Sequence, residues 1–227
     1  MHLASKLVLA VAFLAWSPAP GLTALSGPAS DADVTTLSFT ILRDGAPFGT
    51  HSTTIRRDGG RLLVETKIAA RLDLAFVTLY RFRHESREEW RGGRLVGLDA
   101  FTDDDGRTTR VTAHATPAGL MVNGPNGPFL APPDSMPTTF WHAAFLAAPR
   151  LLDVQEGRLA KVAVEPGGAA NAAGGTAGQQ RRHVTLTGDL QMDLWFEPDG
   201  SLSGTRFLAR GYEITYRRER NELADSR

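Results

Sequence analysis

Apolar and polar residues alternate with a period of two through most of the chain after residue 33. In the segment 62–82, for example, apolar residues share one parity and charged residues share the other. Successive side chains of a strand point to opposite faces, so this pattern predicts strands with one buried face and one face in water. At ~3.3 Å per residue the segment is too long for one straight strand. We therefore expect a bend or break near residues 73–76.

Turn sequences divide the alternating pattern into about ten strands. Asp-Gly or Gly-Gly pairs, which favour tight hairpins, stand at positions 44–45, 59–60, 92–93, 105–106 and 199–200. The fold class predicted from this arrangement is all-β and mainly antiparallel, with a single strongly curled sheet. A closed barrel of lipocalin type is the alternative. Strands are expected over 34–43, 48–57, 62–82 with its break, 95–101, 108–116, 119–123, 160–165, 182–187, 190–196, 205–210 and 212–217.

One helix is expected, over residues 139–148, with a threonine as its N-cap and Pro149 at its end. A sheet with one face in water must have its apolar face covered by another element, and this helix is the predicted element that can cover it. We therefore expect it on the concave side of the sheet. The connection that precedes it, residues 124–137, is rich in proline and glycine. The apolar face of the helix would consist of Phe140, Trp141, Ala144, Phe145 and Ala148.

Residues 1–24 have the parts of a secretory signal peptide. A positively charged start is followed by a ten-residue apolar run at 7–16 and a small-residue exit. The run is too short to cross a bilayer, which takes about 20 residues. We expect cleavage after Ala24, or after Ala19, and a periplasmic or secreted protein. An uncleaved N-terminal anchor is the alternative.

The rest of the chain is predicted to form one domain. A flexible segment over 25–33 leads into a β domain over 34–217, and a charged tail follows over 218–227. Residues 166–180 are mostly Gly and Ala, with Asn and Thr and without periodicity, and we predict a mobile loop there. No later run approaches 18 apolar residues, so we expect no transmembrane segment in the mature chain.

Composition excludes several classes of function. The chain has 25 basic and 25 acidic side chains and no net charge, whereas nucleic-acid binding needs an excess of Lys and Arg. It has no cysteine, which excludes disulfides, thiolate metal sites and a lipid-modified cysteine. We therefore expect no nucleic-acid partner and no lipidation.

The sequence contains no recognisable catalytic or cofactor motif. His51, His84, His114 and His183 fall one to a strand, without the spacing of metal ligands. The run of acids at 103–105 precedes a glycine and indicates a hairpin turn rather than a calcium loop. No nucleophile elbow, phosphate loop or dinucleotide fingerprint is present. We assign no catalytic residue, no metal and no cofactor.

Short motifs are spread over the chain, at 43–45 with 49–51, 80–84 with 88–90, 102–106, 139–142, 152–153 with 157, and 188–190 with 193–195. Together they resemble a family of exported bacterial proteins known only as a domain of unknown function. The chain departs from that pattern at His142, where an amide side chain is expected, and in the long loop at 166–180. The resemblance implies an antiparallel sheet curled into an open half-barrel, similar in shape to the periplasmic lipoprotein carriers, which hold acyl chains in an apolar concavity. It implies no activity.

The aromatic side chains are numerous for one sheet and one helix. A helix that plugs the sheet would use them as core, whereas a pocket that stays open would use them to bind an apolar ligand. We expect an exported protein without enzymatic activity. Its binding partner would be an apolar or lipid-like ligand, or an envelope protein. The predicted ligand-binding residues are Phe76, Tyr80, Phe82, His84, Trp90, Trp141, Phe145 and Trp195.

Two other functions stay open. One is a hydrolase acting on an envelope component, with His84 and Glu88 as acid and base. These two residues lie four positions apart on one strand, which separates them by about 13 Å. This distance is too long for direct contact unless the strand bends, so we rank the hypothesis lower. The other is a purely structural envelope protein without a small ligand.

Overall fold

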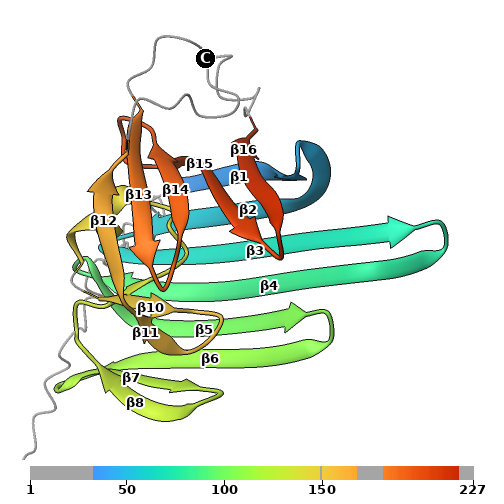
Figure 1. The fold of residues 1–227 in the computed structure, drawn as a ribbon. Helices are drawn as coiled ribbons and strands as arrows, with labels where there is room; N and C mark the ends of the chain where they lie inside the picture. The colour runs from blue at the N-terminus through green and yellow to red at the C-terminus, as the bar shows by residue number, and fades with distance from the viewer. Residues whose placement is uncertain (1–32, 149, 168–180, 220–227) are drawn as a thin grey trace, which may run out of the picture. The chain divides into compact units, whose positions relative to one another are not determined.

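The alternating segments pair into one antiparallel sheet of 13 strands (Figure 1). The structure is a computed structural model and describes residues 33–148, 150–167 and 181–219. The order of the strands is β12-β13-β14-β15-β16-β1-β2-β3-β4-β5-β6-β7-β8. The first strand therefore lies inside the sheet, and β16 pairs with it antiparallel. The predictions for residues 1–32, 168–180 and 220–227 lie outside the described residues.

The first eight strands run in chain order from the inside of the sheet to one edge. They are β1 Asp33–Arg43, β2 Ala46–Asp58, β3 Arg61–Leu74, β4 Val77–Arg91, β5 Arg94–Asp104, β6 Arg107–Thr116, β7 Gly119–Gly124 and β8 Gly127–Ala131. The last five start from the other edge: β12 Val162–Pro166, β13 Arg182–Gly188, β14 Met192–Phe196, β15 Leu202–Ala209 and β16 Tyr212–Arg218. A second sheet of three short strands consists of β9 Met136–Pro137, β10 Leu151–Asp153 and β11 Arg158–Ala160.

The hairpin turns confirm the turn predictions. Both central residues have positive φ at Asp44–Gly45, Gly59–Gly60, Gly92–Gly93 and Asp105–Gly106. This is the backbone of a type I′ turn, whose twist matches that of the flanking strands. The expected break near 73–76 is also a hairpin turn, since Leu74 pairs with Val77 across it.

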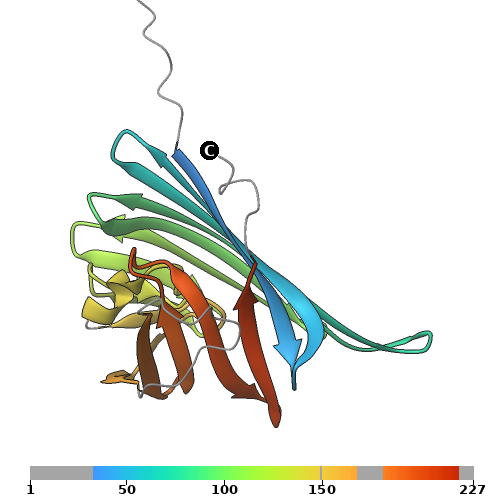
Figure 2. The same ribbon diagram turned by 90° about the horizontal axis from the view of Figure 1, so that it is seen from above.

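The sheet is strongly curled and open. Figure 2 shows it folded over near the β16–β1 pairing, with the short strands of the second sheet between the two halves. The strands β8 and β12 are its edges and do not pair with each other. The all-β antiparallel prediction is therefore confirmed, and the closed barrel is wrong.

The predicted number of about ten strands is too low. Residues 124–137 were expected to be a connection, but they contain β8 and β9. The strands β9, β10 and β11 have only two or three residues each. Segments of that length do not show an alternation that a sequence pattern can detect, and proline in β8 and β9 weakens the signal further.

The predicted helix over 139–148 is wrong. The structure has one turn of 3₁₀ helix there, η1 (Ala143–Ala147), capped by His142 instead of a threonine. Phe140 has a φ of +51°, which lies in the left-handed region and cannot continue a right-handed helix. The turn nevertheless contributes Phe145 to the core.

Backbone hydrogen bonds to the β14–β15 turn explain why the helix does not form. The Ala143 N–H donates to the Gly200 carbonyl over 2.8 Å, and the Leu202 N–H donates to the Trp141 carbonyl over 3.1 Å. These bonds use groups that a helix would need for its own ladder. The segment is therefore held as an extra bridge against the sheet.

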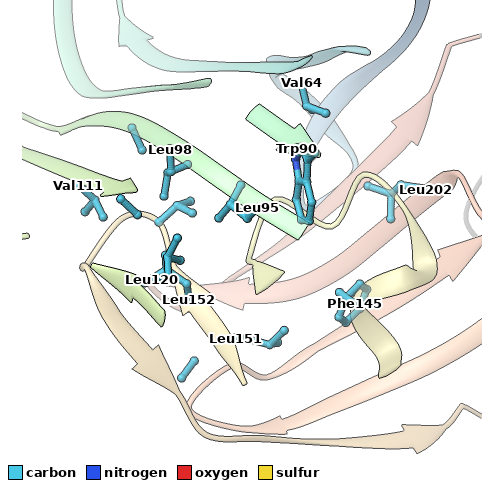
Figure 3. Close-up of a cluster of buried hydrophobic side chains, with 14 of the residues drawn as sticks. Val64, Trp90, Leu95, Leu98, Val111, Leu120, Phe145, Leu151, Leu152 and Leu202 are labelled. Atoms are coloured by element: carbon cyan, nitrogen blue, oxygen red, sulfur yellow. The ribbon is translucent and has the colours of Figure 1, made fainter. Parts of the chain in front are cut away.

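The core lies on the concave side of the sheet (Figure 3). It combines inward-facing residues of β3 to β7 with residues of β13 and β14 and of the second sheet. The buried residues of each long strand alternate with exposed ones, as the pattern predicts. The labelled core residues are Val64, Trp90, Leu95, Leu98, Val111, Leu120, Phe145, Leu151, Leu152 and Leu202.

Candidate functional site

Two adjoining cavities lie beside this core. The first, which we call the histidine cavity, has a volume of about 490 Å³ and is lined by His51 and His84 among others. The second, the apolar cavity, has a volume of about 420 Å³ and contains Tyr80 and Phe82 in its wall. They share the lining residues Ile68, Gln155, Phe207 and Tyr216. The two cavities therefore adjoin at these four side chains.

The wall of the apolar cavity comes from the inward parity of the central strands. Ala70 pairs with Phe82 and Leu72 pairs with Tyr80 across β3 and β4. A register shift between Leu72 and Asp73 keeps these side chains on one face despite the nearby turn. The other half of the sheet supplies further apolar side chains, which are Phe207, Ala209, Ile214 and Tyr216.

Polar groups join the two halves of the sheet at the apolar cavity. The Tyr80 hydroxyl donates to Asp104 over 2.8 Å, and the Arg210 guanidinium donates to the same carboxylate over 2.8 and 3.0 Å. Arg210 also lies over the Tyr80 ring, 4.8 Å from its centroid. Burial and the bond to Asp104 raise the pKa of Tyr80 to about 12. Tyr80 is therefore a neutral, fixed part of the wall.

Arg43 is the other cation that lines the apolar cavity. Its guanidinium lies 3.9 Å from the centroid of the Tyr212 ring. Among the residues that the structure describes, no carboxylate lies within ion-pairing distance of it. Within the described part of the chain, Arg43 therefore packs on aromatic rings without a carboxylate partner.

Both histidines of this cavity belong to one row of paired residues across the strands β2 to β5. His51 pairs with Ile68, Ile68 with His84, and His84 with Thr102. His84 Nδ1 and the Thr102 hydroxyl are 2.9 Å apart. His51 Nε2 lies 3.0 Å from the Thr53 hydroxyl. The other nitrogen of His51, Nδ1, is buried and has no hydrogen-bond partner in the described part of the protein.

Both histidines are neutral at neutral pH. Burial, together with a smaller effect of the neighbouring His84, lowers the pKa of His51 to about 4. Burial also lowers the pKa of His84 to about 4, although Glu85 opposes this effect. The charged imidazolium form would lose its hydration at these positions, and this loss outweighs the attraction of Glu85 for His84.

Acid is therefore expected to destabilise the protein through these two rings. An unfolded histidine binds a proton near pH 6.5, but the folded rings bind one only near pH 4, so stability is complete above 6.5 and declines towards 4. Between pH 7 and pH 5 we expect a loss of about 2 kcal/mol of unfolding free energy for each ring. Urea unfolding at pH 7, 6 and 5 measures it. A variant with His51→Phe and His84→Phe should show a shallower slope, and equal slopes would contradict the assignment.

Glu88 lies on the same face of β4 as His84 but outside both cavities. Its side chain has no exposed surface. The Thr139 hydroxyl donates to Oε1 over 2.6 Å, and the indole N–H groups of Trp90 and Trp141 donate to Oε2 over 2.8 and 3.1 Å. Burial raises the pKa of this carboxyl, and the three hydrogen bonds partly oppose the effect. Glu88 thus fastens the segment before η1 to the sheet.

The structure brings together only some of the predicted ligand-binding residues. Tyr80 and Phe82 line the apolar cavity, and His84 lines the histidine cavity. Trp90 and Trp141 contact each other edge to face and bind Glu88. They line neither cavity.

The other three lie elsewhere. Phe145 packs in the core against Phe196, with ring centroids 5.8 Å apart. Trp195 stacks on the His183 ring at 4.6 Å, on the face of β14 opposite to the buried Leu194. Phe76 stands at the tip of the β3–β4 hairpin and is fully exposed. None of them lines either of the two cavities.

Sequence reasoning missed His51 as a site residue. A register shift between Ile41 and Leu42 brings His51 opposite Phe39, which a regular hairpin from the 44–45 turn would not do. The alternation in β2 does place His51 on the same buried face as Thr53 and Ile55. This alternation was the feature of the sequence that could have identified His51 as a site residue. Tyr216 and Phe207 were missed because the pairing of β16 with β1 is not visible in the sequence.

Neither metal ligation nor a membrane-spanning helix is found in the described ranges. Within residues 33–148, 150–167 and 181–219, no three His, Asp or Glu side chains cluster closely enough to hold a metal ion. In the same ranges, no helix has the length and apolar character needed to cross a bilayer.

The fold and site define the class of protein: an open, curled antiparallel sheet with a two-part cavity on its concave face. The chain belongs to the family described as Domain of unknown function (DUF6134), whose model matches residues 39–219. The resemblance to a domain of unknown function is therefore confirmed. Comparisons with curated proteins and with solved structures found no match.

Proposed function

We propose that this protein is an exported, non-enzymatic binder of a lipid-like ligand, which lies in the apolar cavity. The observation that carries the proposal is the cavity itself, a space of about 420 Å³ between two halves of one sheet. Sites for small molecules are concave, mostly apolar and largely preformed. The wall includes Ile41, Ala70, Leu72, Phe82 and Ile214, whereas the polar groups gather at Tyr80, Asp104 and Arg210.

Side-chain contacts support a cavity that keeps its shape. Phe48 stacks on Tyr80 with ring centroids 6.0 Å apart. Arg210 and Asp104, which are 106 positions apart in the chain, are joined by two hydrogen bonds. A wall that is fixed in advance lowers the entropy cost of binding.

We infer that the ligand enters from the β3–β4 tip. Leu79 lines the apolar cavity and is half exposed. Leu74, Phe76 and Val77 continue this exposed apolar surface around the turn, and the hairpin extends beyond the neighbouring strands (Figure 1). An exposed apolar patch beside a cavity is typical of a surface that contacts lipid or another apolar partner.

The hydrolase hypothesis gains no support from the geometry. His84 lines the histidine cavity, but Glu88 does not. Both carboxylate oxygens of Glu88 already accept hydrogen bonds from other side chains. An acid and a base must both reach the reacting group, so no observation favours this pair as catalysts. The experiment described next also distinguishes a lipid-like ligand from an envelope protein as the binding partner.

Native mass spectrometry of the protein purified from its own periplasm tests the proposal. We expect a chain shortened by the signal peptide, with lipid bound at near-stoichiometric amount. An uncharged apolar fluorescent probe should bind the delipidated protein and be displaced by the extracted lipid. A ligand-free mass together with no probe binding would contradict the proposal and would favour an envelope protein as the partner. An intact Met1 would contradict export.

A further inference from the structure

Arg43 brings a positive charge into the wall of the apolar cavity. It shares one face of β1 with Ile41, which also lines the cavity, and it pairs with the lining residue Ile214 of β16. Its guanidinium carbon lies 3.9 Å from the centroid of the Tyr212 ring and 5.8 Å from that of the Phe48 ring. Both rings belong to the same lining. The guanidinium therefore lies at the wall of the cavity and not on the outer face of the sheet.

The two acids beside the adjoining turns do not pair with Arg43. The Asp44 carboxylate accepts a hydrogen bond from the Glu213 N–H over 2.9 Å, and the Asp44 N–H donates to the Glu213 carbonyl over 2.9 Å. The side chain of Glu213 lies on the face of β16 opposite to Tyr212 and the cavity, because the side chains of a strand alternate. Within the described ranges, Arg43 forms no ion pair.

The lining of the apolar cavity therefore carries one uncompensated positive charge. Its charged members among the described residues are Arg43, Arg210 and Asp104. The Asp104 carboxylate accepts from Arg210 over 2.8 and 3.0 Å and from the Tyr80 hydroxyl over 2.8 Å. Asp104 thus balances Arg210, and the charge of Arg43 is left over. A bound molecule with one negative charge would balance the lining, whereas a bound cation would be repelled.

This charge lies at the outer end of the cavity, where the head of an amphiphile can stay near water. Arg43 ends β1 and Tyr212 begins β16, and the turns beside them lie next to each other (Figure 2). Arg43 is half-buried, and Tyr212 is 41% exposed. About 7 Å further along the strands, Ile41 pairs with Tyr216, and Ile41 is only 2% exposed. Burial thus increases from Arg43 inward, as the order of head group and chain in an amphiphile requires.

We propose that the ligand is an anionic amphiphile, whose negative head group binds the Arg43 guanidinium while its chain occupies the apolar cavity. The head group is a carboxylate or a phosphodiester, since both carry one negative charge and both can accept two hydrogen bonds from a guanidinium. The inference rests on the proposed function, because it specifies the head group of the same ligand. It agrees with entry from the β3–β4 tip, since the β1–β2 and β3–β4 turns lie at the same end of the antiparallel sheet.

Three probes of matched chain length test the head group: decanoate, 1-decanol and a lysophosphatidylglycerol with a decanoyl chain. Displacement of an uncharged fluorescent probe from the delipidated protein at pH 7 gives their dissociation constants. We expect at least one of the two anions to bind the native protein more tightly than 1-decanol, by about fivefold or more. The anion that binds more tightly identifies the head group as a carboxylate or a phosphodiester.

Substitutions at Arg43 locate the head group. Arg43→Gln removes the charge, and we expect it to weaken the tighter anion by about tenfold or more, as for the loss of a charge-assisted hydrogen bond. Binding of 1-decanol should change less than about twofold. Arg43→Lys keeps the charge but loses the planar fork, so it should weaken the anion less than Arg43→Gln does.

The matched control is Arg217→Gln. Arg217 is an exposed arginine of β16 that lines neither cavity. Its substitution lowers the net charge of the protein by the same amount as Arg43→Gln. All three dissociation constants should stay within about twofold of the native values.

The outcomes separate the two proposals. If neither the fluorescent probe nor any amphiphile binds the native protein, the proposed function fails. If the amphiphiles bind but Arg43→Gln leaves the anions unaffected, or weakens them no more than Arg217→Gln does, the proposed function stands and the anionic head group at Arg43 is overturned. The comparison of probes on the native protein covers the case in which Arg43→Gln does not fold. Binding of 1-decanol that is as tight as that of both anions would overturn the inference without any variant.

Discussion

Glu88→Leu is expected to lower the free energy of unfolding by about 3–5 kcal/mol. The substitution keeps an apolar contact in the space but leaves three donors without an acceptor: the Thr139 hydroxyl and the indoles of Trp90 and Trp141. Each buried orphan costs about 1–3 kcal/mol, and removing a buried acid offsets part of the total. Urea unfolding at pH 7 measures the loss, and thermal unfolding should show a midpoint lower by about 10 °C.

Glu88→Gln is the matched control. Its amide oxygen can accept from both indoles while its amide N–H donates to the Thr139 hydroxyl. Burial raises the pKa of Glu88 in the folded protein. The contribution of this residue to the free energy of unfolding therefore falls as the pH rises above the ordinary pKa of a glutamate. The Gln variant should therefore be at least as stable as the native protein at pH 7. A Leu variant as stable as the Gln variant would contradict the role of the hydrogen bonds.

Ala70→Trp is expected to abolish ligand binding, with at least a tenfold rise in the dissociation constant of an apolar probe. Ala70 is buried in the wall of the apolar cavity, between Ile68 and Leu72 on one face of β3. A large ring at this position would fill the space that the ligand needs. The measurement is a fluorescence titration of the delipidated protein.

Ala69→Trp gives the comparison at the next residue. Ala69 is exposed and lies on the opposite face of the same strand. The Ala69→Trp variant carries the same added ring, but this ring does not reach the cavity. The affinity for the probe should therefore stay within about twofold of the native value. Loss of binding in both variants would show a general effect on β3, and loss in neither would place the ligand outside the apolar cavity.

Local chemistry let the sequence determine the strands and their turns. The alternation assigns Ala70, Phe82 and Glu88 to the buried side of β3 and β4, since side chains of a strand alternate whatever lies around them. Pairs such as Asp44–Gly45 determine tight turns because they tolerate positive φ. Family membership follows from residues 39–219 as a whole.

Only the tertiary structure decided what meets across the sheet. Glu88 and Thr139 are 51 positions apart, and Arg210 and Asp104 are 106 apart. The segment before η1 has the apolar spacing of a helix, but its backbone bonds to the β14–β15 turn hold it extended. The physical reason is that pairing depends on register shifts and on long loop closures, whose free energy comes from packing and not from the local sequence. The two adjoining cavities are products of that packing.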